Sequence, residues 1–176
     1  MRRTLPPVRA QVPLLALALL LAAALVRGCI ALRADWTAPA PDAPGTQLLL
    51  YDARNEKVLT LPLEEYLFGV VASEMPASFS PEALKAQAVS ARTYAARHLR
   101  AYGGKACGAH GADMCSDSTC CQAWRSRADH MARWGDNADF YAQKIDEAVR
   151  ETAGVVALYA GRPIDALYHS TSGGAT

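Results

Sequence analysis

Along parts of this chain apolar residues recur every three or four positions, and this spacing predicts helices. Apolar side chains return every three or four residues over 63–74, which predicts a helix. Pro76 bounds it, because the residue before a proline is pushed out of the helical region. A second helix is predicted from Ser80, a good N-cap followed by a proline, to the glycine pair at 103–104. A third helix is predicted over 137–152.

Shorter apolar runs bounded by turn residues predict two β-hairpins. The segment 105–135 shows no apolar period, and we expect it to be a loop held by crosslinks or metal. Taken together, the pattern predicts an α+β fold, with mixed helices and β-hairpins around a substrate groove and a single membrane segment before them. The strands are predicted over 47–51 and 57–61 in the first hairpin, and over 155–159 and 164–168 in the second.

The N-terminal region carries an unbroken apolar run, typical of an export signal. Three arginines precede the run and two follow it, which favours a cytoplasmic N-terminus. A bilayer span needs about 20 residues and a signal-peptide core about 7 to 15, so a retained anchor is preferred and a cleaved signal peptide stays open. Lipidation of Cys29 is a third alternative. The predicted segments are a cytoplasmic basic N-terminus (1–11), a signal anchor or signal peptide (12–32), a Pro/Ala-rich tether (33–45) and a folded domain (46–176).

These features predict a single-pass membrane protein whose folded domain is extracytoplasmic, with a secreted or lipid-anchored protein as the alternatives. The formal net charge of the 176-residue chain is +1, and 20% of its residues are charged. A nucleic-acid-binding domain usually shows a strongly basic balance. We therefore expect no nucleic-acid partner.

Four cysteines and a histidine are concentrated within 15 residues of the predicted loop. Zinc is commonly held by four Cys and His ligands at short spacings, and a site with four protein ligands is structural. The extracytoplasmic setting also permits two disulfides, an alternative that the tight spacing opposes. The preferred zinc ligands are His110, Cys115, Cys120 and Cys121, with Cys107 as a substitute.

Glu74 ends the first predicted helix, where the negative end of the helix dipole favours a protonated carboxyl group. The next helix has polar positions that an Ala- and Leu-rich helix would not need. Gln87, Ser90 and Tyr94 are three and four residues apart and share a face that can offer hydrogen bonds. Arg92 can reach acidic groups or orient Glu74. A solvated helix face is the alternative for Ser90.

Four motifs follow one another in a defined order. They are Leu61-Pro62-Leu63-Glu64-Glu65-Tyr66-Leu67 through Val71, then Glu74-Met75-Pro76, then Ala86-Gln87-Ala88-Val89 with Ala91-Arg92-Thr93-Tyr94, and lastly Tyr168-His169-Ser170-Thr171-Ser172-Gly173-Gly174. With these motifs, residues 46–176 resemble the stage II sporulation protein D family, also described as amidase-enhancer-like proteins. Family sequences continue past the last motif, so the chain resembles a member truncated at its C-terminus.

The resemblance implies a lytic transglycosylase that cleaves peptidoglycan strands, preferably strands denuded of stem peptides, during engulfment in sporulation. A single Glu, here Glu74, would act as acid and then base, because the 6-hydroxyl of the sugar itself attacks and leaves a 1,6-anhydro-muramyl end. The chemistry would need no cofactor. A non-catalytic glycan-binding activator of a cell-wall amidase is the alternative.

The resemblance also implies partners and further site residues. The implied partners are glycan strands, a cell-wall amidase and endopeptidase, a membrane-anchor partner, and the membrane itself through the N-terminal helix. Some family members hold zinc with a Cys and His set ending in His-Cys-Gln, where this chain has Cys120-Cys121-Gln122. Trp124 and Trp134 are interpreted as core residues. The predicted substrate-binding residues are Gln87, Ser90, Arg92, Tyr94, Tyr168, His169 and Ser170.

Overall fold

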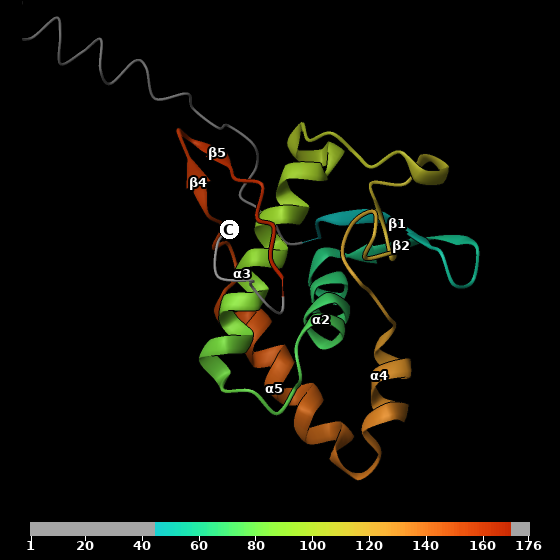
Figure 1. Cartoon of the computed structure of the whole chain (residues 1–176), viewed down its shortest axis with the longest axis vertical. Helices are drawn as coiled ribbons and strands as arrows, with labels where there is room; N and C mark the ends of the chain where they lie inside the picture. Colours follow the sequence, from blue (N-terminus) through green and yellow to red (C-terminus); the bar gives the residue numbers. More distant parts are fainter. Residues whose placement is uncertain (1–44, 170–176) are drawn as a thin grey trace, which may run out of the picture. The chain divides into compact units, whose positions relative to one another are not determined.

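A computed structural model describes residues 45–169, which form an α+β unit (Figure 1). The predicted membrane segment, residues 33–44 of the tether, Cys29 and Ser170 lie outside the described residues. Within 45–169, no helix has the length and apolar character needed to cross a bilayer. The elements are β1 (Gln47–Asp52), β2 (Lys57–Pro62), α2 (Leu63–Glu74), α3 (Pro81–His98), η2 (Arg100–Tyr102), η3 (Ala109–Gly111), β3 (Met114–Cys115), α4 (Arg127–Trp134), η4 (Gly135–Asn137), α5 (Ala138–Glu151), β4 (Leu158–Tyr159) and β5 (Arg162–Pro163).

The first predicted hairpin is confirmed, and a third strand joins it. β1 pairs antiparallel with β2, from Gln47 opposite Pro62 to Asp52 opposite Lys57. β3 adds to the other edge of β1 in parallel, so that the strand order is β2-β1-β3. Side chains alternate along β1, and Leu48 and Leu50 are buried on the core side. The sheet thereby fixes the position of Cys115 within the cysteine-containing segment.

The three predicted helices form the core of the unit. Figure 1 shows α2, α3 and α5 side by side, and they contact one another directly. α2 ends at Glu74, as predicted, because Met75 before the proline is extended with φ −132° and ψ 138°. α3 starts at the predicted N-cap, where the Ser80 hydroxyl accepts a bond from the Ala83 N–H. The helix boundaries thus place Glu74 at a chain reversal between α2 and α3.

Two sequence predictions are wrong in part. The predicted loop 105–135 contains α4, which starts at Ser126, whose hydroxyl accepts a bond from the Asp129 N–H. The second hairpin shrinks to the two-residue strands β4 and β5 around Ala160 and Gly161, which both have positive φ. Its apolar side chains are largely exposed, so little burial extends the pairing.

Candidate active site

Glu74 lies half-buried at the end of α2, beside a cavity of about 280 Å³. The N–H of Ala123 donates to Glu74 Oε1 at 2.8 Å. This bond joins the end of α2 to the loop that follows the cysteines. Among the described residues, Glu74 is the only carboxyl group that lines the cavity. The lining residues are Glu74, Tyr94, Ser118, Cys121, Gln122, Ala166, Leu167 and Tyr168.

A chain of hydrogen bonds crosses the cavity next to Glu74. The buried Tyr66 hydroxyl donates to Gln122 Oε1 at 3.0 Å, and Gln122 Nε2 donates to the Tyr168 hydroxyl at 3.0 Å. Burial and then the charge of Glu74 raise the pKa of Tyr168 well above its ordinary value. Burial, followed by the charge of Cys121, raises the pKa of Tyr94 to about 12. Both phenols are protonated at neutral pH, as an ordinary tyrosine is, and hydroxyl groups on the wall of a cavity can form hydrogen bonds with a sugar.

The structure brings only some of the predicted substrate residues to this cavity. Tyr94 and Tyr168 line it. Gln87 is buried beside Tyr168, and its Nε2 has no hydrogen-bond acceptor among the described residues. The Ser90 hydroxyl is used within α3, where it donates to the Ala86 carbonyl at 3.0 Å.

The remaining predicted residues lie elsewhere. Arg92 is fully buried and donates to both Glu64 oxygens, at 2.6 and 3.2 Å, and to the Val149 carbonyl at 2.9 Å. It therefore does not orient Glu74, because it holds the opposite end of α2. His169 is exposed, and Ser170 lies outside the described residues.

Four cysteine sulfurs converge beside the cavity, and one of these cysteines, Cys121, also lines it. The Sγ atoms of Cys107, Cys115, Cys120 and Cys121 all lie within 4.8 Å of one another, and the last two are 3.8 Å apart. Sulfurs arranged tetrahedrally around zinc are about 3.8 Å apart, given a Zn–S bond of about 2.3 Å. The donor set therefore fits a four-thiolate zinc site. Burial raises the pKa of the Cys115 thiol to about 12.

This cluster differs from the preferred sequence prediction in one ligand. His110 stacks on the ring of Tyr51 with centroids 3.9 Å apart, and the cluster contains Cys107 in its place. The Cys107 N–H donates to the Asp113 carbonyl at 3.0 Å, which pairs the chain entering the loop with the residue before β3. The substitute ligand is thus brought in by backbone pairing that the cysteine spacing did not reveal.

Sequence reasoning missed five residues of the site, which are Ser118, Gln122, Ala123, Ala166 and Leu167. Gln122 had a signal, since it follows the cysteine pair in the motif that resembles His-Cys-Gln. Ala123 acts through its backbone N–H, so its side chain carries no signal. Trp124 is buried, as predicted, against Gly69 of α2. A Cβ at Gly69 would lie 2.5 Å from the Arg125 carbonyl oxygen, so only glycine lets the loop approach this closely.

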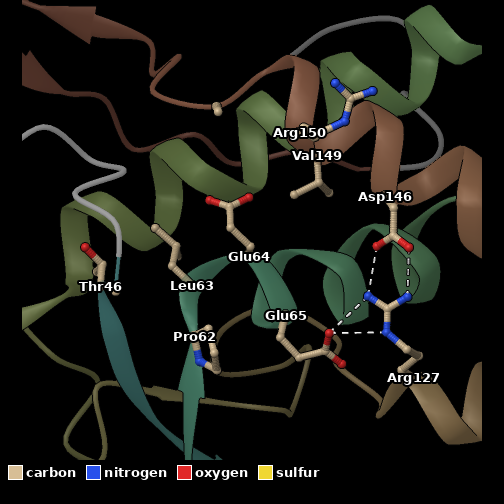
Figure 2. Close-up of a pocket in the computed structure, with 11 residues that line it drawn as sticks. Thr46, Pro62, Leu63, Glu64, Glu65, Arg127, Asp146, Val149 and Arg150 are labelled. Carbon is tan, nitrogen blue, oxygen red and sulfur yellow. Dashed lines mark hydrogen bonds and ion pairs between the residues drawn. The ribbon is translucent and has the colours of Figure 1, made fainter.

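A second cavity of about 480 Å³ lies at the other end of α2 (Figure 2). Figure 2 shows Arg127 between the carboxylates of Glu65 and Asp146, to which it is bonded at 3.0 and 2.8 Å. Glu64, on the same wall, is paired with Arg92. The charged groups here are thus largely satisfied by one another, and the Glu74 cavity is the better candidate site.

Comparisons with known proteins show extended similarity. A family model described as Stage II sporulation protein matches residues 51–159. The chain is 42% identical over 127 residues to Stage II sporulation protein D of Bacillus subtilis (strain 168), and 40% identical over 127 residues to that of Bacillus amyloliquefaciens. Both matches cover 72% of this chain and 36% of the relative. An Amidase enhancer of Bacillus subtilis is 36% identical over 110 residues, or 62% of this chain and 12% of the relative. The chain thus spans about a third of the length of the sporulation proteins that it matches.

Proposed function

Because the chain belongs to the stage II sporulation protein D family, as its motifs predicted, we propose that it is a lytic transglycosylase acting in sporulation. Its substrate would be peptidoglycan glycan strands, preferably denuded of stem peptides, and its products would carry 1,6-anhydro-muramyl ends. The observation that carries this proposal is the single carboxyl group in the cavity. Ordinary glycosidases use two carboxyl groups on either side of the bond, whereas an intramolecular attack needs one.

The position of Glu74 as the one carboxyl group of the cavity lining supports a single residue acting first as acid and then as base. The Ala123 N–H donates to Oε1, and we assign the transferred proton to Oε2. Protonated Glu74 gives this proton to the glycosidic oxygen as the bond to C1 breaks. The 6-hydroxyl of the same sugar then bonds to C1 and returns its proton to Glu74. Atoms balance without water, and the enzyme ends in its starting state.

Cleavage is tested with the full chain and purified denuded glycan strands, with mass spectrometry of the products. We expect anhydro-muramyl ends from the unchanged chain and a loss of about 10³-fold in Glu74→Gln, because a positioned general acid contributes on the order of 10²- to 10⁴-fold. Glu65→Gln is the matched control, since Glu65 lies on the same helix but is paired with Arg127. Undiminished cleavage by Glu74→Gln would exclude the proposed role of this residue.

A second candidate function is a glycan-binding activator of a cell-wall amidase, which the similarity to an Amidase enhancer favours. Its partners would be the amidase, an endopeptidase and a membrane-anchor protein, with the chain held at the membrane by its N-terminal segment. An assay of amidase rate with and without the chain separates the two functions. Stimulation by both the unchanged chain and Glu74→Gln, without anhydro ends from either, would replace the first proposal by the second.

We also propose that Cys107, Cys115, Cys120 and Cys121 bind zinc. Zinc would supply a structural crosslink, with no role in the chemistry. These residues would hold the loop whose Gln122 and Ala123 contact Tyr168 and Glu74.

The zinc proposal is tested by metal analysis of chain purified under reducing conditions. We expect about one zinc per chain, lost in Cys107→Ser and retained in His110→Ala, because a structural site needs all four of its ligands. The opposite pattern would restore the histidine-containing set predicted from the sequence. A metal-free chain with two disulfides, measured by thiol titration, would exclude zinc.

A further inference from the structure

A third cavity, of about 530 Å³, adjoins the Glu74 cavity and is lined by three arginines. Ser118 lines both cavities. Ala123 lines the third cavity while its N–H bonds Glu74, and Ser73 precedes Glu74 in α2. The two cavities are therefore separated by the loop from Ser118 to Ala123, and one extended ligand can reach both.

The arginines of this cavity are Arg54, Arg125 and Arg133. Within residues 45–169, none of the three forms a recorded ion pair with a carboxylate; Arg127 and Arg92, by contrast, are both paired. Arg133 is held in place, since its guanidinium contacts the Ala72 carbonyl at 3.3 Å and His130 Nδ1 at 3.2 Å.

The remaining groups of the cavity do not cancel this charge. Asp117 is the one carboxyl group among the described lining residues, and its Oδ1 accepts bonds from the N–H and hydroxyl of Thr119. The hydroxyls of Ser73, Ser116 and Ser118 complete a polar wall. His130 packs under this wall, 3.2 Å from the Ser73 hydroxyl, and is uncharged at neutral pH because burial lowers its pKa to about 4. Outside the lining, the pKa of Asp129 is lowered by its hydrogen bond with Ser126 and also by the charges of Arg54 and Arg125, so this carboxylate shares part of the positive field. The excess charge of the lining itself is positive and is carried by guanidinium groups, which match carboxylates well.

We propose that this cavity binds the lactyl carboxylate of a muramyl residue in the strand that lies across Glu74. The inference rests on the proposed function and specifies which group of the substrate the site recognises. In intact peptidoglycan the stem peptide is attached to this carboxyl group as an uncharged amide. Removal of the peptide uncovers a negative charge, so an arginine-lined cavity beside the catalytic acid would make the chain prefer denuded strands.

The test measures binding by the full chain carrying Glu74→Gln, so that the probes stay intact. The first probe is a denuded glycan tetrasaccharide, and the second is the same molecule with its lactyl carboxyl groups reduced to alcohols. We expect the carboxylate probe to bind about tenfold more tightly or better, as a charge-assisted bond to arginine contributes. We also expect this difference to shrink as salt is added. Equal binding of the two probes would overturn the inference.

Variants of the cavity arginines test whether this difference in affinity between the two probes arises at the cavity. Arg54→Gln combined with Arg125→Gln should bring the ratio between the probes to about one, because the charge-assisted bonds are lost. Both arginines are exposed, and affinity for the reduced probe should be unchanged, which also verifies that the variant is folded. Arg150→Gln, an exposed arginine on α5 outside this cavity, is the control and should keep the full ratio. An unchanged ratio in the double variant would place carboxylate recognition elsewhere and overturn the inference.

A stem peptide offers a second source of carboxylates, and a peptide-bearing tetrasaccharide distinguishes it. We expect this probe to bind no better than the reduced one, and equal binding with the denuded probe would refute the lactyl assignment. Failure of this inference is separate from failure of the proposed function. Anhydro ends without a carboxylate preference would refute only the cavity assignment, and a carboxylate preference without anhydro ends would refute only the enzyme.

Discussion

Charged side chains are paired with one another at the first turn of α2, whereas those near its last turn form no ion pairs among the described residues. At the first turn, Glu64 and Glu65 are both bound by arginines, one of which is completely buried. At the last turn, Glu74 accepts a backbone N–H, and the arginines of the adjoining cavity have no ion-pair partner among the described residues. Charges that are paired within the fold stabilise it, whereas charges left unpaired beside a cavity are available to a ligand. The comparison therefore separates the end of this helix whose charges are used within the fold, called the structural end, from the end at which we propose the function, called the functional end.

The largest expected effect comes from exchanging carboxyl for amide at each end. Glu74→Gln should lose about 10³-fold in cleavage and keep the free energy of unfolding within about 0.5 kcal/mol. Glu64→Gln should cost about 2 kcal/mol of stability, because it removes the charge that faces buried Arg92, and the half-exposed position of Glu64 moderates the penalty. Denaturant unfolding and product analysis of both variants check that one loses cleavage and the other loses stability. Equal loss of stability in the two variants would contradict the contrast between the two ends of α2.

An effect smaller than the loss of about 10³-fold in cleavage is expected from His130, which packs against Ser73 at the functional end. Burial and then the charge of Arg133 lower its pKa from about 6.5 to about 4. Between these two values the unfolded chain binds the proton and the folded chain does not. Stability should thus be complete above pH 6.5 and fall by roughly 3 kcal/mol as the pH drops to 4.

The pH effect is measured by denaturant unfolding from pH 7 to pH 4. His130→Gln should flatten the slope in this window, and the difference between the two curves removes the contribution of the carboxyl groups. If both curves have the same slope, His130 binds its proton as readily in the folded chain as in the unfolded chain, and below about pH 6.5 the positive charge beside the cavity does not rest on its arginines alone.

The smallest effect is expected at the structural end, from Arg127→Gln. Arg127 bonds two partly exposed carboxylates and lies 3.6 Å from the centroid of the Phe68 ring. We expect a loss of about 1 kcal/mol of stability, since exposed ion pairs and cation–π contacts are each worth at most about that much. The stability of Arg127→Lys should lie between that of the unchanged chain and that of Arg127→Gln. Cleavage should not change, and a drop measured by product analysis would give this end of α2 a role in function.

Local rules account for much of the fold that the sequence predicted. The proline after Glu74 and the Ser80 cap set the helix boundaries that the structure has, and the apolar alternation of 47–51 set the first hairpin. The same rules missed α4, although Ser126 was available as a cap, because the helix buries little apolar surface and its signal was hidden among loop residues.

The chain alone determined that an acid ends a helix, that polar residues follow on the next helix, and that four cysteines lie together in one loop. Only the tertiary structure decided which of these groups meet. It buried Arg92 against Glu64, exchanged His110 for Cys107 in the cysteine cluster, and brought the Ala123 N–H to Glu74. The physical reason is that periodicity and capping depend on neighbours along the chain, whereas pairing of charges, sulfurs and backbone groups depends on segments that only packing brings together.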